Sequence, residues 1–248
     1  MRSPTIGNSA MNVRAEWGVR GLRDLIPETS VFIVVDVLSF STAVDVACAA
    51  RASVLPFPFG DPTRALAEAE RHGCLLAGRR RDPESIYSLS PPTLRKLPAG
   101  SRLLLPSPNG STISFAAEGK PVLAGCFRNA RAVAHKAMEI ADGGVISVIP
   151  AGEHWPDSGL RPAIEDMLGA GCILSELNGQ MDAEAQTLQT VYMAARSNLA
   201  ELVQTSRSGR ELDAMGFPQD VAAALEQEVS DIAPLLTDGI FRGIRTGA

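Results

Sequence analysis

The stretch Val31-Phe-Ile-Val-Val-Asp-Val-Leu-Ser-Phe-Ser-Thr-Ala-Val-Asp45 decides the fold of this 248-residue chain. Five apolar residues, most of them β-branched, lead directly into Asp36, and a short polar turn and a helical pattern follow. A continuous apolar run bounded by turn residues is typical of a strand buried on both faces of a parallel sheet. Asp36 then lies at the carboxyl end of that strand, where open α/β sheets bind their ligands. Because an isolated buried carboxylate is costly, Asp36 predicts a hydrogen-bonding, cationic or metal partner at this point.

The rest of the chain alternates between strand and helix patterns up to about residue 150 and is mainly helical beyond it. Further strands are predicted at 12–16 (an edge strand), 54–57, 74–77, 102–105, 121–124 and 145–149. Helices are predicted around Leu22, from a cap at Ser41 or Thr42, over 61–72, from 112 to 118, and over 129–140, 160–177, 182–204 and 217–230. Residues 78–98, rich in Arg and Pro, predict a functional loop. The order of elements predicts an α/β fold with three α/β/α layers, a mostly parallel or mixed sheet and a helical C-terminal third. We expect a single domain over 1–248, and two lobes with the site in the cleft between them stay open as an alternative.

Composition excludes several classes of protein. Apolar residues make up 45% and charged residues 21%, with a net charge of −5, which is ordinary for a soluble globular protein and argues against nucleic acid as a partner. No apolar run approaches the length of about 18 residues that a membrane span needs, and no signal pattern opens the chain, so we expect a cytoplasmic protein. The four cysteines form no C-x-x-C pair and are predicted to be buried free thiols.

The loop Pro106-Ser-Pro-Asn-Gly-Ser-Thr112 has the composition of an anion-binding turn. Gly110 permits a close backbone approach, and the N-terminus of the helix that follows presents unpaired N–H groups. The candidate phosphate ligands of this loop are Ser107, Gly110, Ser111 and Thr112, with Asn109 beside them. A plain turn with a Ser or Thr helix cap is the alternative that the stretch leaves open.

Carboxylates elsewhere supply hard oxygen ligands for a cation. Glu153 follows the 145–149 strand, and the pair Glu165-Asp166 lies farther along. Together with Asp36 they match the donor chemistry of Mg²⁺, which takes one or two carboxylates plus waters and substrate oxygens. A solvated helix face is the alternative for Glu165-Asp166. No serine lies in a G-x-S-x-G elbow, so the residues favour metal-assisted phosphoryl hydrolysis over acyl transfer.

Two further polar groups follow predicted strands. Arg128 and Asn129 open the 129–140 helix, where they are candidates for binding an anion, and a solvated arginine is the alternative. His154, next to Glu153, is a candidate for acid–base work, although a lone loop histidine is also commonly incidental.

Six motifs occur in the order in which one phosphatase family carries them. They are Val34-Val-Asp-Val-Leu38, Ser107-Pro-Asn-Gly-Ser-Thr112, Ala124-Gly-Cys-Phe-Arg-Asn-Ala130, Ala151-Gly-Glu153, Glu165-Asp166 with Ala170-Gly171, and Ser208-Gly-Arg-Glu-Leu212. From about residue 12 to the C-terminus, the chain therefore resembles the 2-phosphosulfolactate phosphatase (ComB-like) family.

The resemblance implies a Mg²⁺-dependent phosphatase that cleaves 2-phosphosulfolactate to sulfolactate and phosphate, a step of coenzyme M biosynthesis in archaeal members. It implies site roles for Asp36, Asn109, Gly110, Asn129, Glu153, Glu165, Asp166 and Arg210. The chain departs from the pattern at Ser39, where the family has an arginine, and at Gly78-Arg79-Arg80, where it has Gly-Glu-Arg. Arg79 or its neighbours Arg80 and Arg81 are candidates to replace the missing positive charge.

The hypothesis that follows is a Mg²⁺-dependent phosphatase acting on a small phosphorylated or sulfonated organic acid. Its predicted catalytic residues are Asp36, Glu153 and Asn109, and its predicted metal ligands are Asp36, Glu153, Glu165 and Asp166. The predicted substrate ligands are Ser107, Gly110, Ser111, Thr112, Arg128, Asn129, Arg79 and Arg210. A non-catalytic anion-binding protein with the same fold is the alternative, and a homodimer stays open.

Overall fold

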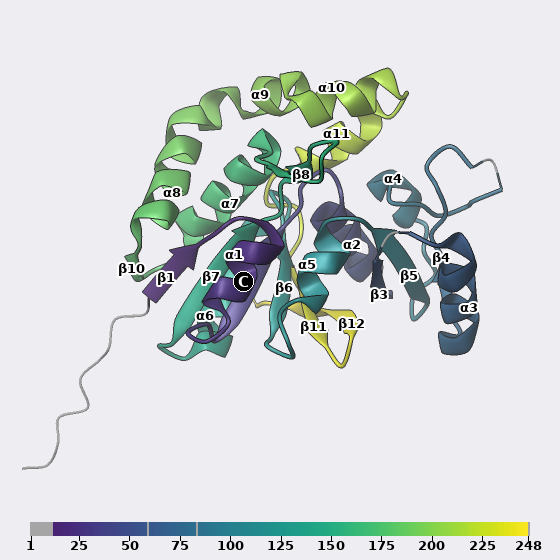
Figure 1. Ribbon diagram of the computed structural model, residues 1–248, viewed down its shortest axis with the longest axis horizontal. Helices are drawn as coiled ribbons and strands as arrows, with labels where there is room; N and C mark the ends of the chain where they lie inside the picture. The colour runs from purple at the N-terminus through teal and green to yellow at the C-terminus, as the bar shows by residue number, and fades with distance from the viewer. Residues whose placement is uncertain (1–11, 59, 83, 248) are drawn as a thin grey trace, which may run out of the picture.

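The computed structural model describes residues 12–58, 60–82 and 84–247, and Figure 1 shows their arrangement. One mixed sheet has the strand order β10-β1-β7-β2-β6-β11-β12-β3-β5-β4, and β8 and β9 form a separate pair. The strands are β1 (Asn12–Ala15), β2 (Val31–Val35), β3 (Ser53–Pro58), β4 (Leu75–Leu76), β5 (Arg102–Ser107), β6 (Val122–Gly125), β7 (Val145–Pro150), β8 (Glu153–His154), β9 (Leu160–Arg161), β10 (Gln180–Met181), β11 (Ile232–Thr237) and β12 (Ile240–Arg245). The α-helices are α1 (Gly18–Leu25), α2 (Phe40–Ala49), α3 (Pro62–His72), α4 (Pro91–Leu94), α5 (Gly110–Phe115), α6 (Ala130–Ala141), α7 (Ile164–Glu176), α8 (Ala183–Ala195), α9 (Leu199–Thr205), α10 (Arg207–Ala214) and α11 (Pro218–Ala224).

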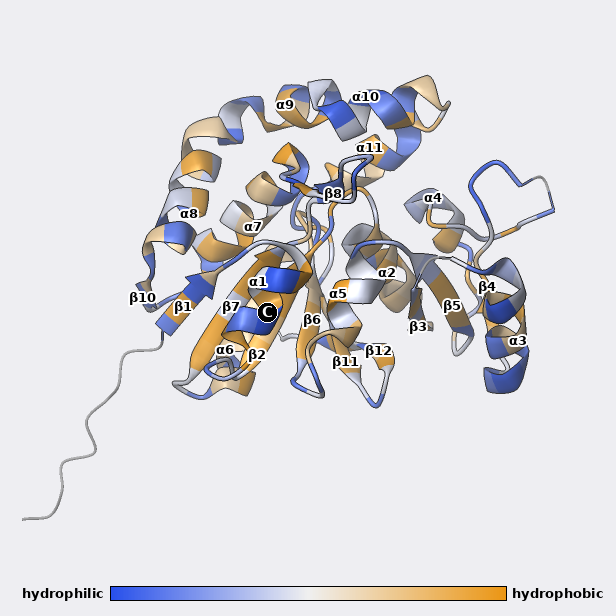
Figure 2. Ribbon diagram, in the orientation of Figure 1, coloured by the Kyte–Doolittle hydropathy of each residue, from blue (hydrophilic) through white to orange (hydrophobic). Residues whose placement is uncertain are grey.

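Strand β2 occupies the interior of the sheet, as its apolar sequence predicts. All five of its residues are buried, and it pairs in parallel with β6 on one side and β7 on the other. Its alternate residues enter two different cores: Ile33 packs with α6 and α7, whereas Phe32 and Val34 pack with α1, α2 and α5. Figure 2 shows these central strands as the most apolar part of the ribbon. The predicted three-layer α/β/α architecture is therefore confirmed.

The C-terminal third is mainly helical, as predicted, and strands β11 and β12 add to it a hairpin that the sequence patterns did not predict. They form an antiparallel hairpin between β6 and β3. The hairpin separates two parallel groups, β10-β1-β7-β2-β6 and β3-β5-β4. The strand predicted at 12–16 is also not at the edge of the sheet, because the short strand β10 pairs with its outer side.

Smaller differences concern helix limits. Helix α2 begins at Phe40 with Ser39 as its N-cap residue, rather than with a cap at Ser41 or Thr42. The predicted helix over 160–177 begins only at Ile164, because residues 153–161 form the β8–β9 hairpin. Helix α3 follows the sequence closely: the Asp61 side chain accepts a hydrogen bond from the N–H of Thr63, as predicted for a cap.

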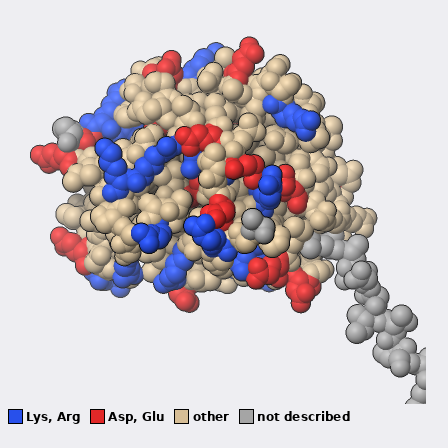
Figure 3. Space-filling view, turned by 180° about the vertical axis from the view of Figure 1, so that it is seen from behind, with Lys and Arg blue, Asp and Glu red and all other residues tan. Residues whose placement is uncertain are grey.

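Helices α8 to α11 follow one another around the rim of the molecule. In Figure 1, α9 and α10 lie across one end of the sheet, next to β8. None of the helices in the described part of the chain has the length and apolar character needed to cross a bilayer. On the face drawn in Figure 3, acidic and basic side chains are interspersed without a broad area of one sign.

Of the cysteines, Cys48, Cys126 and Cys172 are buried free thiols, as predicted, whereas Cys74 is only partly buried.

Candidate active site

Asp36 lies at the carboxyl end of β2, held by two backbone amides from different elements. Its Oδ1 accepts a hydrogen bond from the N–H of Phe40 at 3.1 Å, and its Oδ2 accepts one from the N–H of Gly110 at 3.0 Å. These bonds favour the ionised form, but burial and the nearby Glu153 carboxylate outweigh them and raise the pKa of Asp36 to about 7. The predicted partner of this buried carboxylate is thus partly the backbone, and its charge remains uncompensated.

Asp166 joins two strand ends at the same place. It lies in the first turn of α7, and its carboxylate accepts hydrogen bonds from the N–H of Val37 at 2.8 Å and of Gly152 at 2.9 Å. Burial, followed by repulsion from Asp36 and Glu165, raises the pKa of Asp166 well above its usual range. A solvated helix face, the alternative considered for Glu165-Asp166, is therefore ruled out.

Glu165 is 2% exposed, and its Oε2 has no hydrogen-bond partner among the described residues. An orphaned carboxylate oxygen at this depth is costly, so such an atom points to a missing cation or proton. No three acidic, His or Cys side chains in the described part of the chain are already arranged to hold a metal ion. Mg²⁺ does not need such a cage, because waters and substrate oxygens complete its octahedron. The all-oxygen donor set and the orphaned Oε2 therefore fit Mg²⁺ chemically.

Glu153 and His154 are both tied to Asn109. The Asn109 amide donates through Nδ2 to Glu153 Oε2 at 2.9 Å, and its Oδ1 lies 3.0 Å from Nδ1 of His154. This arrangement assigns the proton of a neutral His154 to Nδ1 and leaves Nε2 as an acceptor. Burial is the main cause that raises the pKa of Glu153, and nearby Glu165 adds to it. Asp36, Glu153, Glu165 and Asp166 are hereafter the carboxylate cluster.

The loop at 106–112 already has an anion at its helix N-terminus. The N–H of Gly110, at the start of α5, is taken by Asp36 rather than left open for a phosphate. Ser111 donates to the carbonyl of Leu105, and Thr112 donates to the carbonyl of Pro108. Ser107 is buried at the end of β5. These contacts are structural and differ from the substrate-binding roles predicted for the loop.

The predicted anion ligands Arg128 and Asn129 are committed elsewhere. The Arg128 guanidinium is buried in ion pairs with Asp45 at 2.8 Å and with Glu226. The Asn129 side chain accepts from the N–H of Cys126 and donates to two backbone carbonyls. These contacts stabilise the fold around α2 and the C-terminal segment, and the substrate roles of the two residues stay predictions.

Arg79 is exposed, and its neighbour Arg80 is the arginine of this loop that reaches the N-terminus of α2. Arg80 Nη2 donates to Ser39 Oγ at 2.7 Å, and its Nε donates to Asp220 on α11 at 2.8 Å. Arg210 is exposed on α10, with no hydrogen bond from its side chain to the described residues.

Arg161 is a neighbour of the carboxylate cluster that sequence patterns did not reveal. It pairs across the β8–β9 hairpin with Glu153, and its charge lowers the pKa of that residue against the effect of burial. Its Nη2 also donates to Ser208 of α10 at 3.1 Å. The turn residues Asp157-Ser-Gly159 are the one sequence signal that could have revealed this hairpin.

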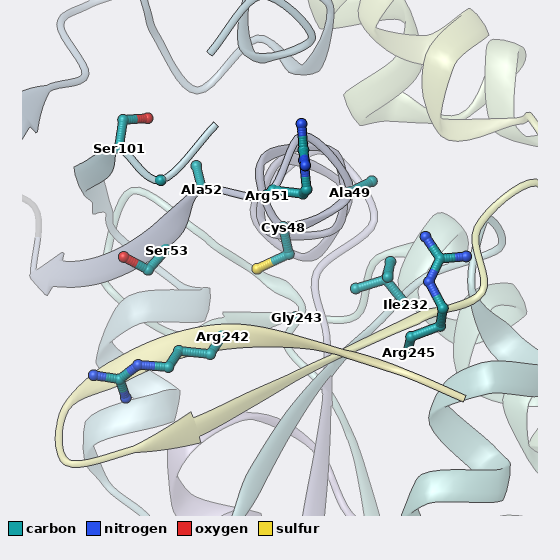
Figure 4. Close-up of a pocket in the computed structure, with 11 residues that line it drawn as sticks. Cys48, Ala49, Arg51, Ala52, Ser53, Ser101, Ile232, Arg242, Gly243 and Arg245 are labelled. Carbon is teal, nitrogen blue, oxygen red and sulfur yellow. The ribbon is translucent and has the colours of Figure 1, made fainter. Parts of the chain in front are cut away.

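A hollow of about 380 Å³ lies away from the carboxylate cluster, between the C-terminal end of α2 and the β11–β12 hairpin (Figure 4). Because α2 is ten residues long, this hollow is about 15 Å from the helix end that follows Asp36. In Figure 4 the guanidinium groups of Arg51, Arg242 and Arg245 lie apart and do not meet at one point. The hollow therefore lacks the converging groups of a phosphate site, and the carboxylate cluster remains the candidate site.

Comparisons with known proteins agree with the sequence motifs. The family described as 2-phosphosulpholactate phosphatase matches residues 22–239 of the chain. The 2-phosphosulfolactate phosphatase of Methanothermobacter thermautotrophicus is 32% identical over 209 residues, which cover 84% of this chain and 87% of that protein. A probable 2-phosphosulfolactate phosphatase of Pseudothermotoga lettingae is 24% identical over 226 residues, covering 89% of this chain and 95% of that protein. Another, from Caldanaerobacter subterraneus, is 28% identical over 182 residues, covering 70% and 73%.

Proposed function

The chain belongs to the 2-phosphosulfolactate phosphatase family, as its motifs predict, and on that premise we propose that it hydrolyses 2-phosphosulfolactate or a close phospho-acid with the help of Mg²⁺. The observation that carries this proposal is the carboxylate cluster, in which burial and mutual repulsion raise the pKa values of Asp36 and Asp166. Four buried or half-buried acids within reach of one another are unfavourable unless a proton or a cation compensates them. A divalent cation is the compensating group that also serves phosphoryl transfer.

The ion would be held by one or two of the predicted ligands Asp36, Glu153, Glu165 and Asp166, with waters and substrate oxygens at its other positions. The orphaned Oε2 of Glu165 is a ready donor. When bound, Mg²⁺ supplies positive charge against the oxygens of the phosphoryl group. The carboxylates of the cluster would have to lose their protons to hold the ion.

The protein's own groups position the reaction. In the reaction, a water oxygen bonds to phosphorus, the ester P–O bond breaks, and phosphate and a hydroxy acid leave. Asn109 fixes Glu153 and His154 relative to each other through its two ends. With its proton on Nδ1, the exposed His154 keeps Nε2 available to take up the proton of the attacking water or to return one to the leaving oxygen. The backbone amides of Phe40 and Gly110 hold Asp36 in place throughout.

The proposal is tested by the release of inorganic phosphate. Purified protein supplied with Mg²⁺ is expected to release phosphate from 2-phosphosulfolactate, and EDTA is expected to abolish the release until excess Mg²⁺ is added back. Glu165→Gln, which keeps the volume of the side chain and removes its charge, should lower the rate by at least about 10-fold and weaken Mg²⁺ dependence.

Two outcomes would contradict the proposal. Turnover that is unaffected by EDTA would remove the metal from the mechanism. A rise in melting temperature with phosphate or sulfolactate, without turnover on any of a panel of phospho-acids, would favour the non-catalytic anion-binding protein.

A further inference from the structure

Arg80 is the cationic side chain that the fold holds at the N-terminus of α2, the helix that follows Asp36. Its Nη2 lies 2.7 Å from Ser39 Oγ and also reaches the carbonyl of Leu89. The next residue after Ser39, Phe40, donates its N–H to Asp36. The guanidinium is therefore separated from the carboxylate cluster by little more than the first turn of one helix.

Hydrogen bonds from several parts of the chain fix the position of Arg80. Asp220 is completely buried in α11, and it accepts hydrogen bonds from Nε of Arg80 and from the hydroxyl of Ser90. Three separate parts of the chain thus converge on one arginine: the 78–90 loop, the α2 N-terminus and α11. Burying a carboxylate to hold an arginine is costly, and such an arrangement is retained where the arginine is needed in one orientation.

Arg80 keeps capacity for a ligand. Its side chain is 19% exposed, and its Nη1 has no hydrogen-bond partner among the residues that the structure describes. The free Nη1 of the guanidinium can donate a charge-assisted hydrogen bond to a carboxylate or a sulfonate. By contrast, Arg128 is fully engaged in internal ion pairs, and Arg79 is an exposed loop residue.

Arg80 is not simply the counter-ion of the carboxylate cluster. Among the described residues, its side chain makes no hydrogen bond or ion pair with any of the four acids of the cluster. The positive charge of Arg80 is directed instead at Asp220 on one side and at Ser39 on the other.

We propose that Arg80, held by Asp220, determines specificity for phosphate monoesters that carry a second anionic group, a carboxylate or sulfonate on the carbon skeleton. Asp220 is a positioning residue in this scheme, because it acts only through Arg80. The inference rests on the proposed phosphatase activity, and it names the residue through which the site recognises the acid group of its substrate.

The test uses two esters with the same three-carbon skeleton. 2-Phospholactate carries a carboxylate that isopropyl phosphate lacks. Wild-type protein should show a higher kcat/KM for 2-phospholactate, and Arg80→Met should reduce this preference by about 10- to 100-fold, mainly through KM, as expected for loss of one charged hydrogen-bonded contact. Isopropyl phosphate should be hydrolysed equally by both proteins. Arg80→Lys keeps the charge but cannot keep the bonds to Asp220 and Ser39 while it donates to a ligand, and it should fall between them.

Asp220→Asn and a remote variant complete the design. Asp220→Asn keeps the shape of the buried side chain and should reduce the preference for 2-phospholactate while leaving isopropyl phosphate unaffected. Arg64→Ala removes one exposed arginine from α3, away from the cluster, and should change neither rate. Equal losses on both esters in Arg80→Met would overturn the inference, because they would show a general structural role.

Calorimetric titration with sulfolactate, which has two anionic groups and no phosphate, separates this inference from the proposed function. Arg80→Met should weaken sulfolactate binding about 10- to 100-fold relative to the wild-type protein. Arg80-dependent binding without hydrolysis of any ester would refute the phosphatase proposal and uphold the role of Arg80. Equal binding to both proteins, or no binding to the wild-type protein, would refute the role of Arg80.

Discussion

Asp36 is an acid whose surroundings oppose its own ionisation. Two amides favour the carboxylate, yet burial and Glu153 prevail and raise its pKa to about 7. An arrangement of this kind favours the binding of a cation, because a bound cation compensates the buried negative charge. The same residues that destabilise the metal-free protein at neutral pH are therefore those expected to bind Mg²⁺.

This preference predicts a dependence of stability on pH. Between the ordinary pKa of 3.8 and the raised value of about 7, the folded protein binds more protons at Asp36 than the unfolded chain does. The free energy of unfolding therefore falls as pH rises through this window. The metal-free protein should show a lower melting temperature at pH 8 than at pH 5, and Asp36→Asn should reduce the difference. Mg²⁺ should raise the melting temperature more at pH 8 than at pH 5, since its ligands must be deprotonated.

Asp24→Asn is the matched control, because it removes a carboxylate that is exposed on α1. It should leave the pH dependence of the melting temperature as it is in the wild-type protein. Identical pH profiles for Asp36→Asn and wild type would show that Asp36 is not the source of the effect.

The sequence predicted the location of the acidic residues of the candidate site better than it predicted the location of the anion-binding residues. Asp36 and Glu153 follow apolar strands, and strand ends are where α/β sheets gather their polar groups. Arg128 and Asn129 follow a strand as well, but their partners Asp45 and Ile232 are far away in the chain. No local sequence pattern indicates such long-range pairing. The sequence therefore could not show that the fold itself uses these donors.

At the scale of single elements, the position of α5 depends on the absence of a side chain at Gly110. A Cβ at this residue would lie 2.1 Å from Cδ1 of Phe40, whose side chain is fully buried. The absence of a side chain lets α5 pack closely enough on α2 for its first N–H to reach Asp36. The glycine in the 106–112 loop thus allows the close packing of α5 on α2, and its predicted role in binding phosphate stays a prediction.

Gly110→Ala is therefore expected to move α5 away from α2. We expect a loss of about 1–3 kcal/mol in the free energy of unfolding, the usual cost of overpacking, together with a loss of phosphatase activity. Urea denaturation followed by circular dichroism measures the first effect and phosphate release the second. Gly60→Ala is the control, since no described atom lies within 4 Å of the place that its new methyl group would take, and it should be close to neutral. Full activity in Gly110→Ala would show that the contact between α5 and Asp36 is dispensable.

The β11–β12 hairpin is the part of the C-terminal segment that the sequence patterns did not predict. Its turn, Asp238-Gly239, is a strong hairpin signal, and both residues have positive φ, at 52° and 76°. The signal was obscured because Pro234 lies within β11, and proline is unusual inside a sheet. Charged residues in β12 further weaken the apolar pattern of an interior strand.

At the scale of the whole molecule, this hairpin connects two parallel groups of strands into one sheet. Strand β11 pairs with β6 through two register pairs, whereas β12 meets β3 only at Phe241 and Val54. The site depends on this connection, because Asp36 belongs to one group and Gly110 follows a strand of the other. The C-terminal hairpin, which contributes no side chain to the carboxylate cluster, therefore supports the relative placement of the two halves of the site.

Phe241 is the residue through which this dependence can be measured. Its ring is fully buried and packs edge-on against Phe40, with ring centroids 6.0 Å apart. Phe241→Ala should lower the free energy of unfolding by about 3–5 kcal/mol, because it removes a large buried side chain and leaves a cavity at the junction of the two groups. Phe115→Ala, at a position 47% exposed on α5, makes the same change in composition and should cost less than about 1 kcal/mol.

Guanidinium unfolding, followed both by circular dichroism and by the fluorescence of Trp17 and Trp155, gives the two free energies of unfolding. Equal costs for the two variants would mean that the parallel groups hold together without Phe241. Coincident transitions from the two probes would show that the hairpin unites them into one cooperative unit.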